Sequence, residues 1–166
     1  TIKGVRRFDI IPPDGPGLLP RRGRPNMACR EKPPVISIVT PSFNQGRFIA
    51  ETIESVLSQE GNFFIEYLVM DGGSTDDTTE ILARYDRRLK NGTWPVRCRG
   101  ISYRWVSEDD KGQADAVNKG FRAAQGEFLG WINSDDTYLP GAFSNAVAHL
   151  DAHPERQLAD HSVVLA

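Results

Sequence analysis

Apolar and polar positions along this chain predict four buried strands, each followed by an amphipathic helix. The strands are apolar, partly β-branched runs at residues 35–40, 64–70, 101–106 and 128–132, and each ends abruptly in polar, turn-forming residues. Apolar residues recur near helical spacing in four segments. The first is residues 46–59, and the second begins after a cap at Thr75 or Asp76 and ends near Asn91. The third is residues 114–124, and the fourth runs from Pro140 to about Leu150. Such alternation is typical of an α/β layered fold with a mostly parallel sheet and right-handed crossovers.

Residues 1–34 differ from the rest of the chain in composition. They are rich in proline, glycine and arginine and offer little to bury. We therefore expect an extended or disordered N-terminal segment over 1–34 and one domain over 35–166. Arg21, Arg22 and Arg24 form a small basic cluster, for which a solvated tail is favoured over contact with anionic lipid or a partner.

Composition narrows the classes of function. The chain has 166 residues and a net charge of −2, which argues against a nucleic-acid partner. Cys29 and Cys98 are the only cysteines, so we expect free thiols and no zinc site. Neither a secretory leader nor an apolar run of about 20 residues is recognisable, so no transmembrane segment is expected and the default location is cytoplasmic.

The polar residues that follow the strands are candidates for one shared site. Carboxyl ends of parallel strands meet at one edge of a sheet, where open α/β folds bind ligands. Four such loops along one edge favour a composite pocket over chance helix capping. They comprise residues 40–44, 71–74, 108–112 and 133–136.

Several residues of these loops have two interpretations. Asp71 can accept a hydrogen bond from a nucleobase or a ribose, or can be a plain turn residue. Pro41 and Phe43 can pack against a base, although Phe43 can equally be a core residue. Lys111 can neutralise a phosphate or form a surface ion pair. Gly112 would let the backbone approach a ligand closely.

Two further groups complete the candidates. Asp115 and Asn118 share one face of a helix near its start, where they point to the pocket or, taken alone, to solvent. Asp135 and Asp136 are hard oxygen ligands suited to Mg²⁺ or Mn²⁺ on phosphate oxygens. Their alternative role is to end the strand and cap the next helix. The expected cofactor is a divalent cation.

Other nucleotide-binding folds fit less well. The chain contains neither GxGxxG after a strand nor GxxxxGK[ST]. A nucleotidyltransferase would need a glycine-rich loop with Lys or Arg after the first strand, and residues 40–46 lack one. His149, His153 and His161 are late and scattered, which gives no support for a histidine metal site or a Ser-His-Asp triad.

Residues 34–150 resemble the nucleotide-sugar-binding half of family-2 inverting glycosyltransferases, which have the GT-A fold, a Rossmann-like three-layer sandwich. The resemblance is carried by blocks in the same order and spacing. They are Val-Ile-Ser-Ile-Val-Thr-Pro-Ser-Phe-Asn at 35–44, residues 53–59, Glu-Tyr-Leu-Val-Met-Asp-Gly-Gly-Ser-Thr-Asp at 66–76, residues 107–120, and Gly-Glu-Phe-Leu-Gly-Trp-Ile-Asn-Ser-Asp-Asp at 126–136.

The resemblance implies a nucleotide-diphospho-sugar donor, often a UDP-sugar, a divalent cation, and a glycan or lipid-linked acceptor. Asp71 would meet the base and Asp135 the metal. Asn133 stands where the family motif Asp-x-Asp has its first Asp. It brings no charge, so either metal affinity is lower or Asp136 compensates. The donor-binding set so implied is Thr40, Pro41, Ser42, Asn44, Asp71, Gly72, Ser74, Lys111, Gly112, Asp115, Asn118, Asn133, Ser134 and Asp135, with Asp135 and Asp136 on the metal.

The sequence departs from the family at its end. Family members continue into an acceptor half that carries the general base, whereas about thirty residues follow Asp136 here. We assign no base and expect a truncated domain, either an enzyme fragment or a non-catalytic module that binds nucleotide-sugar and depends on a partner. An incomplete sheet exposes an edge, which favours a homodimer. Peripheral association with the inner face of a membrane is a further expectation.

Overall fold

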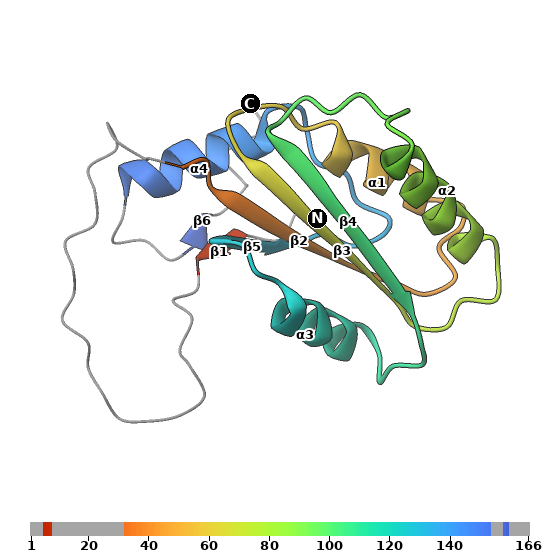
Figure 1. The fold of residues 1–166 in the computed structure, drawn as a ribbon. Helices are drawn as coiled ribbons and strands as arrows, with labels where there is room; N and C mark the ends of the chain where they lie inside the picture. Colours follow the sequence, from red (N-terminus) through yellow and green to blue (C-terminus); the bar gives the residue numbers. More distant parts are fainter. Residues whose placement is uncertain (1–4, 8–31, 154–157, 160–166) are drawn as a thin grey trace.

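The computed structural model describes residues 5–7, 32–153 and 158–159, and it confirms the predicted order of four strands and four helices (Figure 1). Two short strands are added to them. The elements are β1 (Val5–Arg7), β2 (Val35–Ser42), α1 (Ile49–Leu57), β3 (Phe64–Asp71), α2 (Thr78–Lys90), β4 (Gly100–Ser107), α3 (Gln113–Ala123), β5 (Phe128–Trp131), α4 (Ala142–Ala152) and β6 (Leu158–Ala159).

One mixed sheet, in the order β4-β3-β2-β5-β1-β6, organises the molecule. The four strands from β4 to β5 are parallel, as the sequence predicts. β1 pairs antiparallel with β5 and with β6. β1 belongs to the N-terminal segment that we expected to be extended or disordered, and these three residues are paired in the sheet. Residues 1–4 and 8–31 of that segment lie outside the described residues.

The helices form layers on both faces of the sheet. α1, α2 and α4 cover one face and α3 covers the other (Figure 1). The main core lies under the first group, where β-branched and aromatic residues of β2 and β3 are fully buried against Ile53, Leu82 and Phe143. On the other face α3 crosses β2 so closely that a Cβ on Gly120 would lie 2.4 Å from a Val39 methyl carbon. None of the described helices is both long enough and apolar enough to cross a membrane.

The helix starts differ from the predicted ones. α1 begins at Ile49 after Phe48, three residues later than the predicted start at residue 46. Asn44 is a loop residue with φ 52° whose Oδ1 accepts a hydrogen bond from the Thr75 amide. α4 begins at Ala142 rather than at Pro140. The loop before α1 bonds to the loop after β3, through Ser74 and Asp76. The loop before α4 bonds to side chains of α1, through Thr52 and Ser55.

The second helix is delimited nearly as predicted. α2 begins at Thr78, and Asp76 Oδ1 accepts a hydrogen bond from the Thr78 amide at 3.0 Å. Asp76 Oδ2 accepts another from the Gly46 amide at 2.9 Å, so this side chain also ties α2 to the loop after β2. Asn91 is the C-cap and Gly92 adopts φ 65°, the left-handed conformation that ends a helix.

Candidate functional site

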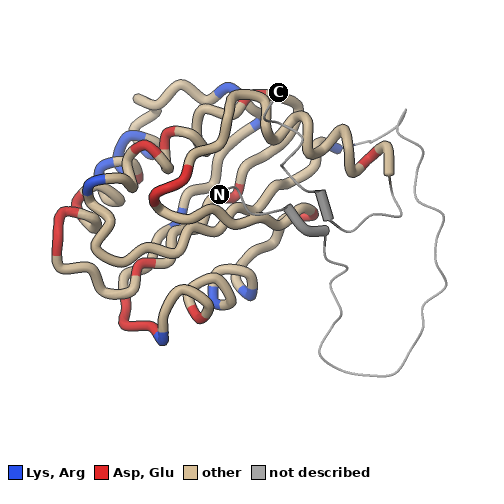
Figure 2. The backbone as a smooth tube through the Cα atoms, turned by 180° about the vertical axis from the view of Figure 1, so that it is seen from behind, with Lys and Arg blue, Asp and Glu red and all other residues tan. Residues whose placement is uncertain are grey.

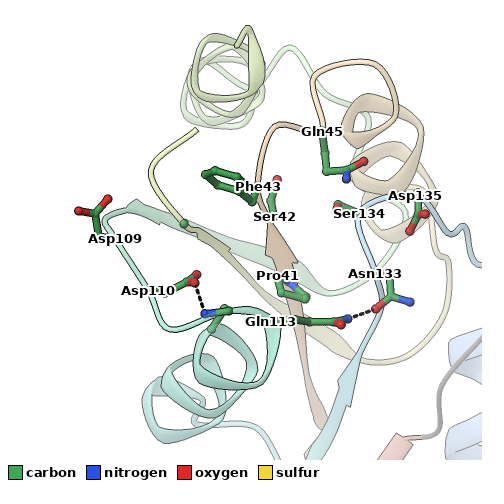
Figure 3. A pocket seen from close by; sticks show the side chains of 13 residues that line it. Pro41, Ser42, Phe43, Gln45, Asp109, Asp110, Gln113, Asn133, Ser134 and Asp135 are labelled. Atoms are coloured by element: carbon green, nitrogen blue, oxygen red, sulfur yellow. Dashed lines mark hydrogen bonds between the residues drawn. The ribbon is translucent and has the colours of Figure 1, made fainter. Parts of the chain in front are cut away.

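The carboxyl ends of the four parallel strands enclose a cavity of about 840 Å³ (Figure 3). Every strand-ending loop identified in the sequence contributes to it, so the composite pocket exists. The cavity is lined by Pro41, Ser42, Phe43, Gln45, Gly72, Asp109, Asp110, Gly112, Gln113, Ala116, Asn133, Ser134 and Asp135.

The end of β2 provides an apolar wall with one polar group. Phe43 is 58% exposed and lines the cavity, so it is not a core residue. Pro41 lies beside it and is buried. Ser42 is 5% exposed, and its buried Oγ has no hydrogen-bond partner among the described residues. A buried hydroxyl without a partner is costly, so a ligand that bonds to it gains affinity.

The loop between β4 and α3 places two aspartates against the two glycines that follow β3. A Cβ on Gly72 would lie 2.8 Å from Asp110 Oδ2, and a Cβ on Gly73 would lie 2.8 Å from Asp109 Oδ1. The absence of side chains at 72 and 73 therefore makes room for both carboxylates. Asp110 Oδ1 accepts a hydrogen bond from the Gly112 amide at 2.7 Å. Figure 2 shows the acidic run 108–110 as a continuous stretch ahead of α3.

The end of β5 forms the opposite wall. Asn133 is held on both sides: its Oδ1 accepts a hydrogen bond from Gln113 Nε2, and its Nδ2 donates to Asp136 Oδ2 at 3.0 Å. Ser134 is buried, and its carbonyl accepts a bond from Thr52 Oγ1 at 2.9 Å. Asp135 is exposed at the cavity wall and makes no hydrogen bond with the described residues. Its carboxylate is free for a ligand or a cation.

Asp71 lies elsewhere than the sequence led us to expect. Its side chain is 2% exposed and does not line the cavity. Asp71 Oδ2 accepts hydrogen bonds from the Ser74 amide at 2.9 Å and from Ser107 Oγ at 2.6 Å, and Oδ1 accepts one from Ser74 Oγ. The carboxylate thus joins the end of β3 to the end of β4 and to the following turn.

Six more of the predicted donor-binding residues also lie outside the cavity lining: Thr40, Asn44, Ser74, Lys111, Asp115 and Asn118. Thr40 is buried and shares a 2.9 Å hydrogen bond with the Tyr67 hydroxyl. Burial raises the pKa of Tyr67. Asn44 and Ser74 bond to each other's loops. Lys111 and Asn118 are exposed.

Asp115 is likewise outside the lining and stabilises the start of α3. Its carboxylate accepts a hydrogen bond from the Lys111 amide at 3.2 Å and lies 3.4 Å from Lys119 Nζ. The Lys111 amide is the first cause that lowers the pKa of Asp115, and the nearby Lys119 charge lowers it further. Asp115 therefore acts here on the helix itself.

Asp109, Asp110, Gln113, Gln45 and Ala116 line the cavity but were missed as site residues. A signal for the two aspartates was present, because they belong to the polar run that ends the third predicted strand. The place of Gln113 in the site depends on its hydrogen bond to Asn133, twenty residues away in the sequence, and could not be predicted from local sequence.

The donor set at the cavity fits a cation shared with a ligand better than an all-protein metal site. Among the described residues no group of three His, Cys, Asp or Glu side chains could hold a metal ion. Mg²⁺ and related ions are commonly held by one or two carboxylates plus substrate phosphates. Asp135 lines the cavity and can supply such a carboxylate, whereas Asp136 lies outside the lining and accepts a hydrogen bond from Asn133. No Lys, Arg or His lines the cavity among the described residues, so none of them places a cation at the lining beside a phosphate group bound there.

A parallel α/β sheet with a ligand cavity at the carboxyl ends of its strands is the arrangement of nucleotide-binding α/β proteins. The model of Glycosyl transferase family 2 matches residues 37–163. The chain therefore belongs to glycosyl transferase family 2, and its fold is the GT-A fold, as the resemblance predicted.

Individual relatives agree. An uncharacterised glycosyltransferase of Mycobacterium tuberculosis (strain H37Rv) is 36% identical over 118 residues, covering 70% of this chain and 40% of that protein. Chondroitin synthase of Escherichia coli is 30% identical over 115 residues, covering 69% of this chain and 15% of the synthase. The crystal structure of S. aureus TarS 1–349 with UDP-GlcNAc matches with a TM-score of 0.59 at 25% identity, covering 72% of this chain and 32% of TarS. The chain thus spans 40% or less of each.

Proposed function

We propose that the cavity binds a nucleotide-diphospho-sugar, with the base at the β2 wall and the diphosphate at the β5 wall. One observation carries this assignment: a single cavity has the exposed aromatic ring of Phe43 at one side and the free carboxylate of Asp135 at the other (Figure 3). The ring offers a stacking surface for a base. The UDP-GlcNAc held by the structurally similar TarS supports a sugar nucleotide, in particular a UDP-sugar, as the ligand.

Charge is the reason to expect a divalent cation at this site. Asp109, Asp110 and Asp135 line the cavity, and no basic side chain lines its described part. A diphosphate would be repelled by these carboxylates unless a cation lay between them. Asp135 and Asp136 would hold Mg²⁺ or Mn²⁺, which would neutralise the departing diphosphate. Asn133 contributes no charge but fixes Asp136 through its amide.

The activity of the whole protein that we propose is transfer of the sugar to an acceptor hydroxyl with inversion at the anomeric carbon. Membership of the family supports this reaction, and the similarity to a chondroitin synthase supports a polysaccharide or another glycan as acceptor. The role of this chain is to bind and orient the donor. Deprotonation of the acceptor needs a general base, which we do not assign.

The alternative is a non-catalytic module that binds nucleotide-sugar, alone or with a partner chain. It would use the same cavity and needs no general base, a group that we assign to no described residue. Donor hydrolysis or transfer, measured with and without metal, separates the two. Because we assign no general base within this chain, turnover by the whole protein supports the enzyme, and tight donor binding by the whole protein without turnover supports the module.

Calorimetry with a UDP-sugar tests the site. We expect binding in the presence of Mn²⁺ and a loss of affinity of at least about tenfold without it, because the diphosphate then faces the carboxylates directly. A similar loss is expected in Asp135→Ala, because the cation then has one ligand fewer. Glu80→Ala is a matched control, since Glu80 is exposed on α2 and outside the cavity. Unchanged affinity in Asp135→Ala with Mn²⁺ would show the metal assignment to be wrong.

A further inference from the structure

We propose that Asp110 and Ser42 read the nucleobase and select bases that carry a ring N–H beside a carbonyl, namely uracil, thymine and guanine. The inference rests on the proposed function, in which the cavity binds a nucleotide. It replaces Asp71, the residue that the sequence assigned to the base, with a residue on a different loop.

Asp71 is excluded from base recognition by its existing bonds. Three hydrogen bonds, from the Ser74 amide, Ser74 Oγ and Ser107 Oγ, engage both of its carboxylate oxygens. The side chain is 2% exposed and takes no part in the cavity lining. A base could reach it only by breaking bonds that join β3 to β4.

Asp110 has one oxygen fixed and the other available. Oδ1 is held by the Gly112 amide at 2.7 Å, which orients the carboxylate. Oδ2 lies against Gly72, 2.8 Å from the position that a Cβ would occupy there, and has no hydrogen-bond partner among the described residues. The carboxylate thus lies over Gly72. Asp110 is one of the side chains that line the cavity (Figure 3). An oriented carboxylate oxygen is an acceptor only, so it requires an N–H from the ligand.

Ser42 supplies the complementary donor. Its residue lies next to the same glycine, because the Gly72 amide donates to the Ser42 carbonyl at 2.8 Å. Ser42 lines the same cavity, and its buried Oγ has no partner among the described residues. A hydroxyl can donate to a carbonyl oxygen, so the pair presents one acceptor and one donor.

This pair of groups matches some bases and opposes others. Uracil and thymine present N3–H beside a carbonyl, and guanine presents N1–H beside O6. Cytosine and adenine place an unprotonated ring nitrogen where Asp110 needs a donor, which leaves two acceptors facing each other. A site built to hydrogen-bond one ligand rejects the analogue that leaves its buried groups unpaired.

The first test compares nucleoside diphosphates on the chain with Mn²⁺ by calorimetry. UDP and GDP are expected to bind at least about tenfold more tightly than CDP and ADP, the factor that one lost hydrogen bond to a charged group produces. UDP methylated at N3 should bind as weakly as CDP. If all five bind equally, the base is not read and this inference fails, while the nucleotide site remains. If none binds, the proposed function fails with it.

The second test changes the acceptor into a donor. In Asp110→Asn the Gly112 amide should retain the side-chain oxygen, so that Nδ2 takes the place of Oδ2 and can donate to cytosine N3. The ratio of UDP to CDP affinity should then fall by at least about tenfold. Asp109→Asn is the control, because it removes the same charge next door, and its ratio should stay as in the wild type. An unchanged ratio in Asp110→Asn, or an equal change in both variants, would overturn the assignment.

Ser42→Ala provides an independent check. Because Ser42 Oγ bonds to no described residue, its removal should leave the urea midpoint unchanged or raise it slightly. UDP affinity should fall severalfold. Full UDP affinity in this variant would remove Ser42 from base recognition.

Discussion

Two regions of the same sheet hold acidic side chains in opposite states. In the middle of β3, on the face covered by α3, Glu66 is 6% exposed, and its carboxylate accepts hydrogen bonds from Ser37 Oγ, from the Gln125 amide at 2.7 Å and from Arg104 Nη2 at 2.6 Å. At the carboxyl ends of the strands, one oxygen of Asp110 and both oxygens of Asp135 accept no hydrogen bond from the described residues. The difference shows that bonding, rather than residue type, separates acids engaged within the fold from acids left available at the cavity.

The Glu66 cluster has a structural role that the cavity depends on. Ser37 Oγ also accepts a hydrogen bond from the Gly126 amide at 2.8 Å, so β2, β3, β4 and the connection after α3 meet at one carboxylate. This joint fixes the carboxyl end of α3, whose other end carries Gly112 and Gln113 to the cavity wall. A buried carboxylate that satisfies four strands and loops is expected to contribute to stability and not to bind ligands.

The largest effect is expected from Glu66→Ala. It leaves Ser37 Oγ and the Gln125 amide without their acceptor and Arg104 without its counter-ion, at a cost of about 3 kcal/mol in the free energy of unfolding. Urea denaturation measures this loss. Glu60→Ala is the matched control, because Glu60 and Arg97 are both exposed and their atoms lie 4.0 Å apart, a pair expected to contribute close to nothing. Equal midpoints for the two variants would contradict the structural role of Glu66.

The second largest loss of stability is expected from Asp71→Ala, which tests a fully bonded acid at the end of a strand. Removal of its carboxylate leaves the Ser74 amide and Ser107 Oγ without a partner, and a loss of about 2 kcal/mol is expected by urea denaturation. The ratio of UDP to CDP affinity should stay at the wild-type value. A changed ratio without a loss of stability would restore the sequence-based assignment of Asp71 to the base.

Asp71 and Asp110 also show how far the sequence could predict this site. The strand positions could be predicted from apolar runs that stop at polar clusters. Because parallel strands end at one edge of a sheet, the sequence also predicted that one pocket includes Pro41, Ser42, Gly72 and Asp135, and all four line the cavity. Which acid faces the cavity depends on partners distant in the sequence. Asp71 pairs in register with Ser107, and that contact buries its carboxylate. No local pattern records such a contact.

The limits of the fold prediction have the same cause. β2 reaches Ser42 because its last residues pair with β3 up to Asp71, although Pro41 reads locally as a break. β1 consists of three residues in a proline-rich segment, and it is a strand only because β5 offers an edge to pair with. Propensity cannot identify elements of this length, since their formation depends on the partner strand.

Gly72→Ala tests the space that the carboxylate of Asp110 occupies. The new Cβ would lie 2.8 Å from Oδ2, and the flexible end of Asp110 should move away rather than the backbone. We expect a loss of UDP affinity of up to about tenfold with a change in stability below about 0.5 kcal/mol. A double-mutant cycle with Asp110→Ala provides the control, because the effect of the methyl group should disappear once the carboxylate is gone. Additive losses would show that Gly72 acts independently of Asp110.

The smallest effect concerns Asp76, an exposed acid whose oxygens are nevertheless engaged. Hydrogen bonds from the Thr78 hydroxyl first, and from the Gly46 and Thr78 amides, lower the pKa of its carboxyl. Its stabilisation is therefore fully present above the ordinary carboxyl pKa and is lost as the pH falls through the lowered pKa of the folded state. Asp76→Asn should cost about 0.5 kcal/mol at pH 6, a value at the low end for helix caps because solvent screens the site, and the difference from the wild type should shrink below about pH 4. Urea midpoints at pH 6 and pH 3 measure it, with Asp77→Asn as the control, since Asp77 is the N-cap of α2 and makes no side-chain capping bond. The hydrogen bonds to Asp76 would not be the source of its stabilisation under either of two outcomes. One is a loss of unfolding free energy in Asp76→Asn that equals the loss in the control, and the other is a loss that grows toward low pH.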